Sequence, residues 1–311
     1  MGGNRNAIAY GILKSAKVNT KGMSPKQAWQ KVKELGLIGK AKSYGYTDDE
    51  LDALFDEINN FHPTPEMERV IEKAKGVAKK VTVTTNAHEN FEKAIDRLLA
   101  LKERYGFEML EEIRTEDWVG TNPASVRKKG QVLVLSNSFL ENPQIVLDED
   151  MKNFSETKDD YNFAKNQYDK AKKTHSVDNN LETEYINKAK KYAFLREHVH
   201  MYEGMLPKEI IDVVLTHEIG HIISSGFSNE KKSQLLNKFL KLKKQYELID
   251  KPEDTVPIQM LSYRAIKDVS EFFSELFVAF EYKEPTADIL IPQIIGENTY
   301  EQQGFLGWIR S

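Results

Sequence analysis

The sequence predicts a predominantly helical α+β protein with a small sheet and a helical N-terminal region. Capped segments with apolar residues at helical spacing occupy most of the 311 residues. A short run of β-formers from Val132 to Leu135 is the strongest strand signal. The composition, 40% hydrophobic and 30% charged, is that of a chain that folds in water. This length fits one large domain or two ordinary ones.

The first 80 residues are predicted to form short helices. Ser24-Pro25 opens one that runs to Gly36, a capping box from Thr47 opens a second to about Asn60, and Thr64-Pro65 opens a third that ends near Lys80. Residues 1–46 hold nine Lys or Arg and one acid, although the whole chain has a net charge of −4. We interpret this basic arm as a solvated leader. The alternative is contact with nucleic acid, a membrane or another acidic surface, but the arm lacks interleaved aromatics or a recognised nucleic-acid motif.

Between residues 81 and 148 the pattern changes to that of a mixed segment. We expect a strand over Val81–Thr84, and then a helix capped near Asn86 that reaches about Tyr105. Asn122-Pro123 and Lys129-Gly130 are turn signals. The further strands are expected over Phe107–Arg114, Ser125–Lys128 and Gln131–Ser136.

Residues 149–204 are highly charged, and their tyrosines and alanines recur at helical spacing on both sides of a polar break at Ser176–Asn180. This pattern predicts two long amphipathic helices in an antiparallel hairpin. We therefore expect two regions, a helical one over 1–80 and a second domain over 81–311 that carries the hairpin as an insertion.

Composition excludes several classes of function. The chain has no cysteine, which removes disulfides, thiol catalysis and thiolate metal sites. No stretch approaches the roughly 18 apolar residues of a membrane span, and the N-terminus has no apolar signal core. These features favour a cytoplasmic, virion-associated or non-classically delivered protein, and they leave its compartment and oligomeric state open.

A chemically distinctive pattern lies in the apolar helix predicted over 207–224, which carries His217, Glu218 and His221. Burying such groups without partners costs on the order of 2–7 kcal/mol each. The two histidines are four residues apart, so both rings leave one helix face and can bind one Zn²⁺ at about 2.0–2.1 Å. Glu218 is turned about 100° away, where it can take a proton from metal-bound water. The small Gly220 within the motif would allow another segment to pack closely against this helix. The alternative interpretation is two core histidines beside a salt-bridged Glu.

A zinc site of this HExxH type needs a third protein ligand. The predicted helix over 268–280 carries Glu271 and Glu275 on one face among phenylalanines. A nearby cation would stabilise both acids, one by direct ligation and one through a ligand histidine. The alternative is a helix N-terminus that favours acids, with Asp268 as its cap.

His217-Glu-Ile-Gly-His221, followed about fifty residues later by Ser270-Glu-Phe-Phe-Ser-Glu-Leu-Phe277, resembles the catalytic domain of the anthrax lethal factor-like zinc metallopeptidases. This gluzincin family includes the proline–proline endopeptidases. The resemblance covers about 205–282 and implies a gluzincin-type domain with one zinc per chain. It implies that Glu271 is the third ligand and that Tyr263, in the Ser262-Tyr263 pair, assists at the transition state.

The sequence thus predicts a zinc-dependent endopeptidase, a metalloprotease that acts on a peptide or protein. His217, His221 and Glu271 would hold zinc, with Glu275 orienting a ligand histidine. Glu218 would be general base and then proton donor, and Tyr263 would donate to the oxyanion. The strand Gln131–Ser136 is a candidate for pairing with substrate backbone if it lies at a sheet edge. The alternatives are a zinc hydrolase of another amide and a structural or interaction protein, for example phage or mobile-element encoded, with a peptidase-like domain.

Overall fold

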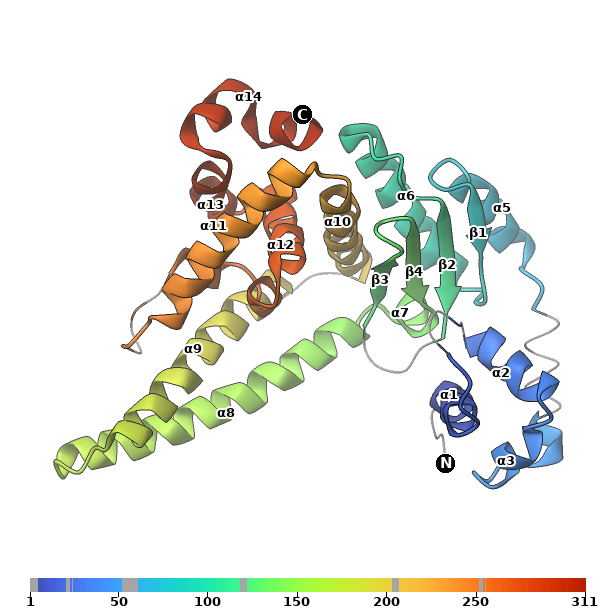
Figure 1. Ribbon diagram of the computed structural model, residues 1–311, viewed down its shortest axis with the longest axis horizontal. Coiled ribbons are helices and arrows are strands. Elements are labelled where there is room, and N and C mark those ends of the chain that lie inside the picture. Colours follow the sequence, from blue (N-terminus) through green and yellow to red (C-terminus); the bar gives the residue numbers. More distant parts are fainter. Residues whose placement is uncertain are drawn as a thin grey trace.

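A computed structural model gives the protein an α+β fold in which helices surround a four-stranded sheet (Figure 1). The α+β class predicted from the sequence is therefore confirmed. The structure describes residues 5–20, 23, 25–51, 61–117, 122–202, 207–251, 254 and 256–311. Among these residues, none of the helices combines the length and the apolar character that crossing a membrane requires.

The N-terminal helices form a small unit with its own core. They are α1 (Arg5–Ser15), α2 (Pro25–Glu34) and α3 (Ile38–Lys42). Their hydrophobic cluster is separate from the main core and contains Ala9, Ile12, Leu13, Ala28, Trp29, Val32, Ala41 and Leu51. The capping box at Thr47 is present, since its Oγ1 accepts the Glu50 N–H while its own N–H donates to the Glu50 carboxylate. The cap expected at Ser24 and the helix expected beyond Leu51 lie outside the described residues.

Helix α5 (Pro65–Ala74) begins at the predicted cap, because Thr64 Oγ1 accepts the Met67 N–H. It ends at Ala74, earlier than the predicted residue 80, because the chain turns over residues 75–77 before strand pairing begins at Lys80. Its buried side chains Met67, Val70 and Ala74 belong to the main core. The change from one core to the other therefore falls between Leu51 and Met67, whereas the sequence suggests a boundary near residue 80.

The sheet has the strand order β1-β2-β4-β3. Strands β1 (Lys80–Thr82), β2 (Glu112–Glu116) and β4 (Val132–Ser136) are parallel, and β3 (Ala124–Arg127) runs antiparallel to β4. The segment predicted as the strand Gln131–Ser136 is thus an inner strand, so its candidacy as the edge that meets substrate is wrong. The edge strands are β1 and β3, and β3 is the edge strand that pairs with β4.

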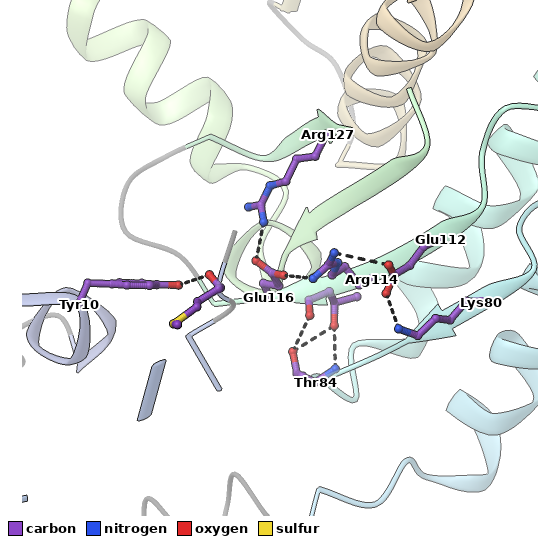
Figure 2. A network of polar contacts seen from close by, with 9 residues as sticks. Tyr10, Lys80, Thr84, Glu112, Arg114, Glu116 and Arg127 are labelled. Atoms are coloured by element: carbon purple, nitrogen blue, oxygen red, sulfur yellow. Dashed lines mark hydrogen bonds and ion pairs between the residues drawn. The ribbon is translucent and has the colours of Figure 1, made fainter. Parts of the chain in front are cut away.

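A row of charges crosses one face of the sheet (Figure 2). Lys80 pairs with Glu112, Arg114 bridges Glu112 and Glu116, and Glu116 also pairs with Arg127 of β3. Alternate residues of β2 supply the middle of the row, as the two-residue period of a strand requires. The row therefore ties β1, β2 and the edge strand together through side chains as well as through the backbone ladder.

Helix α6 (His88–Tyr105) ends at Gly106, whose φ of 69° is a left-handed cap. Residues 107–111 lead into β2, which starts at Glu112 instead of at the predicted Phe107. After β4 come the short α7 (Asn137–Glu141) and the two helices of the predicted hairpin. These are α8 (Ile145–Lys173) and α9 (Asn179–Tyr202).

The hairpin is confirmed as two long helices that pack along each other and project from the rest of the chain (Figure 1). Stacked aromatic pairs hold them together: Tyr161 with Tyr192 at 4.8 Å between ring centroids, and Tyr168 with Tyr185 at 4.8 Å. The tyrosines whose spacing predicts the helices are thus the residues that join them.

The C-terminal part is helical and carries the central packing of the molecule. Helix α10 (Pro207–Ser225) contacts α6, α12 (Val269–Glu281) and β3. The other elements are α11 (Asn229–Glu247), the 3-10 helices η1 (Pro257–Met260) and η2 (Tyr263–Ile266), α13 (Pro285–Ile295) and α14 (Glu297–Arg310).

The far end of α12 is anchored to α6 by charge. Glu281, with a side chain only 2% exposed, pairs with Arg97 at 3.1 Å and with Arg104 at 2.9 Å, and it accepts a hydrogen bond from Tyr105. Arg97 also donates to Thr216 Oγ1 of α10 at 2.8 Å. A buried acid with this many partners is costly to separate from them, so it fixes how α6, α10 and α12 meet.

Candidate metal centre

The two histidines of α10 turn one nitrogen each towards a common point. The Nε2 atoms of His217 and His221 are 3.1 Å apart. Their other nitrogens already have partners: His217 Nδ1 lies 2.9 Å from Glu275 Oε1, and His221 Nδ1 lies 2.8 Å from Ser270 Oγ. A ring that donates through Nδ1 leaves a lone pair on Nε2. Two such lone pairs that face each other favour a shared cation between them.

Glu271 supplies a third donor atom at the same point. Its Oε2 lies 3.3 Å from His217 Nε2 and 3.9 Å from His221 Nε2, and it is buried without a hydrogen-bond partner. Tetrahedral ligands at about 2.0–2.1 Å from zinc are roughly 3.3–3.4 Å from one another. The separations of 3.1, 3.3 and 3.9 Å are close to that arrangement. Two overlapping groups that share His217 could hold a metal ion: His217 with Glu218 and His221, and His217 with Glu271 and Glu275.

The start of α12 explains how Glu271 reaches this point. Asp268 caps the helix, and its Oδ1 accepts the N–H groups of Ser270 at 2.8 Å and Glu271 at 3.0 Å. The cap predicted at Asp268 is thus confirmed. Glu271 falls in the first turn, and Glu275 lies one turn further along the same face. The two acids therefore reach opposite nitrogens of the His217 ring.

Glu218 lies beside the three donor atoms and makes a different set of contacts. Its carboxyl is buried, accepts a hydrogen bond from the backbone N–H of Val126 on β3, and has one oxygen, Oε2, without a hydrogen-bond partner. Burial raises the pKa of Glu218, against the opposing charges of His217 and Arg264. A carboxyl with a raised pKa and a free oxygen is suited to accept and return a proton.

The electrostatics of the cluster favour a cation. Burial acts to lower the pKa of His217, but the surrounding carboxyl groups outweigh it and raise that pKa to about 10. Burial, together with the charge of His217, lowers the pKa of His221 to about 4. Three carboxyl groups, those of Glu218, Glu271 and Glu275, therefore lie around the two imidazoles. A divalent ion would balance the excess of acid and let both rings stay neutral.

Close contact between α10 and α12 sets the distance across the cluster. A Cβ built at Gly220 would lie 2.7 Å from Ser274 Cα, closer than any side chain tolerates. The close neighbour expected at Gly220 is therefore present. Since Gly220 lies between Glu218 and His221, and Ser274 lies between Glu271 and Glu275, this contact brings the two helices together at the level of the cluster.

The edge strand β3 runs next to Glu218. Ser136 N–H donates to Pro123 O at 2.9 Å, so these residues form a hydrogen-bonded pair of the antiparallel ladder. Such pairs alternate, which turns the N–H and C=O groups of Ala124 and Val126 away from β4. The Val126 N–H that reaches Glu218 belongs to this outward set.

The structure brings together five of the six predicted site residues: His217, Glu218, His221, Glu271 and Glu275. For the sixth, Tyr263, it describes the backbone at the start of η2, and the side chain lies outside the described residues.

Three neighbours of the cluster escape sequence reasoning. Ser270 binds a histidine ring, Val126 binds Glu218 through its backbone, and Arg264 acts on Glu218 through its charge. Ser270 carries a local signal, because it directly precedes Glu271 on a helix that faces the two histidines. Val126 and Arg264 carry none, because their places depend on pairing between distant segments.

Comparison of the chain with family models, with curated proteins and with solved structures finds no match. The resemblance to lethal factor-like metallopeptidases therefore stays a prediction, and the case for function rests on the geometry of the cluster.

Proposed function

We propose that the protein is a zinc-dependent endopeptidase of the gluzincin type. The observation that carries the proposal is the convergence of His217 Nε2, His221 Nε2 and Glu271 Oε2 at separations of 3.1–3.9 Å, with both Nδ1 atoms already bonded elsewhere. This donor set, two imidazoles and a carboxylate without thiolate, is one that catalytic zinc sites use. When bound, zinc would polarise the scissile carbonyl and lower the pKa of a coordinated water.

Glu218 would carry the proton transfers. Its unpartnered Oε2 accepts a proton from the attacking water as the water oxygen bonds to the carbonyl carbon. The same oxygen then returns the proton to the leaving nitrogen as the C–N bond breaks. The Val126 N–H holds the other part of the carboxyl in place during both transfers. Tyr263 stays the proposed hydrogen-bond donor to the oxyanion.

The edge position of β3 supports a peptide as the substrate. An extended peptide beside this edge would meet the outward N–H and C=O groups of Ala124 and the C=O group of Val126, whose N–H is bonded to Glu218. Backbone pairing of this kind gives affinity without regard to side chains, and it is available to peptides but not to most other amides. This feature favours an endopeptidase over a zinc hydrolase of another amide.

The test compares the wild type with Glu218→Gln. We expect about one zinc per chain by elemental analysis in both, and cleavage of a peptide library by the wild type alone. Turnover should fall by several orders of magnitude, since both proton transfers depend on one carboxyl. Asp212→Asn, a change of the same kind on the same helix, is the matched control and should keep cleaving. A wild type that takes up no zinc on titration would refute the proposal.

A further inference from the structure

A pocket of about 500 Å³ is lined in part by Ser270, the residue bonded to His221 Nδ1, and Nδ1 is the other ring nitrogen from the Nε2 atom near the donor point. The end of α10 and the starts of α11 and α12 form its walls. It shares Ser270 with the cluster, because Ser270 lines the pocket and its hydroxyl is bonded to His221. A ligand in this pocket would therefore lie one imidazole ring away from the donor atoms.

The lining of the pocket combines apolar and basic side chains. Phe227, Leu235, Leu236 and Val269 supply the apolar part, and Leu236 is 41% exposed. Two exposed lysines, Lys129 and Lys232, also line it, and no Asp or Glu is among the described lining residues. An apolar recess of this size holds a large side chain. The two lysines attract negative charge.

The pocket also lies close to the end of the edge strand β3. Lys129 belongs to the turn that directly follows β3, three residues beyond Val126. At about 3.3 Å per residue, a strand added beside Val126 reaches Lys129 within roughly 10 Å. A peptide that pairs with β3 and passes Glu218 therefore arrives at the pocket with a residue about three positions from the scissile bond.

We propose that this pocket is a specificity subsite that takes an apolar side chain of the substrate, and that Lys129 and Lys232 select an acidic residue beside that side chain. The proposal deepens the proposed peptidase function and rests on it for the identity of the bound peptide as substrate. It makes the preferred substrate an acidic–apolar segment whose cleaved bond lies a few residues from the pocket.

Binding is tested apart from catalysis by methyl NMR on full-length Glu218→Gln protein with labelled Leu and Val. The probes are the blocked tripeptides acetyl-Asp-Leu-Asp-amide and acetyl-Lys-Leu-Lys-amide. We expect the acidic probe to shift the signals of Leu235, Leu236 and Val269. Its dissociation constant should be roughly 5- to 20-fold lower than that of the basic probe, the effect of two exposed ion pairs. Equal binding of the two probes, or shifts confined to other elements, would overturn the proposal.

Charge reversal supplies the variant test. Lys129→Glu with Lys232→Glu should reverse the preference between the probes, whereas Lys241→Glu with Lys244→Glu, on α11 but outside the lining, should preserve it. Ser233→Phe, at an exposed lining position, should block both probes and serves if charge reversal impairs folding. The assignment would be contradicted if the Lys241/Lys244 variant lost the preference for the acidic probe. It would also be contradicted if the Lys129/Lys232 variant kept that preference.

The outcome for the subsite is separable from that for the peptidase. A wild type that binds the acidic probe in the pocket but cleaves no library peptide would refute the peptidase and leave a peptide-binding pocket. A wild type that cleaves library peptides with no excess of acidic residues near the bond would refute the subsite and leave the peptidase.

Discussion

Glu271 and Glu275 lie one turn apart on α12 but address different nitrogens of His217, and this difference predicts different consequences of mutation. Glu271→Ala removes an oxygen 3.3 Å from Nε2 and should empty the site. Glu275→Gln keeps an acceptor near Nδ1, 2.9 Å away in the native protein, and should lose about 10–100-fold in zinc affinity. Chelator competition measures both dissociation constants. If Glu275→Gln emptied the site while Glu271→Ala kept its metal, the two roles would have to be exchanged.

Ser270 is expected to act through His221. Its hydroxyl fixes the ring at 2.8 Å, whereas the helix cap uses its backbone N–H and survives any side-chain change. Ser270→Ala should therefore weaken metal binding by about 10-fold or more with no loss of folding. The absorption spectrum of the Co²⁺-substituted protein should shift, because a freed ring changes the ligand field. Ser270→Thr restores the hydroxyl and should restore both properties; a Thr variant as impaired as Ala would contradict the role.

At the scale of elements, the α10–α12 contact at Gly220 is expected to be sensitive to a single methyl group. In Gly220→Ala the new Cβ meets the backbone of Ser274 at 2.7 Å, so the helices must separate, at a cost of about 1–3 kcal/mol. Denaturant unfolding should show this loss together with weaker zinc binding. Gly11→Ala in α1 is the matched control, because a Cβ there meets nothing within 4 Å and Ala is the better helix former. Equal effects of the two changes would refute the packing argument.

The sequence predicts the helical elements well because their signals are local. Caps at Thr64 and Asp268 mark helix starts, and tyrosine spacing marks the hairpin. The HExxH spacing places both histidines on one face for the same reason. The sheet was harder to predict, since strand order depends on partners far away in the chain. Gln131–Ser136 has the best strand composition and is buried along the strand, which is typical of an inner strand rather than an edge.

For the whole molecule, removal of metal is expected to leave the fold intact. The helices that carry the donor atoms are packed by the main hydrophobic core, and α12 is also held by Glu281. A chelator-treated sample should keep its far-ultraviolet circular dichroism, in contrast to small domains that unfold without zinc. Its melting temperature should fall and should recover on addition of Zn²⁺. Collapse of the helical signal on chelation would show that the metal, and not the core, holds these helices.

Helix α12 also fixes the distance between its anchored end at Glu281 and the metal cluster at Glu271. Glu281 fastens one end to α6, and Glu271 stands ten residues away, which at 1.5 Å per residue is about 15 Å. A slip of α12 by a single residue would carry Glu271 about 1.5 Å along the helix axis, nearly half its separation from His217 Nε2. The position of Glu271 in the cluster is therefore set by the ion pairs of Glu281, which take no part in binding the metal. Substitution of Arg97 or Arg104 would therefore shift the donor atoms of the cluster although neither arginine contacts them.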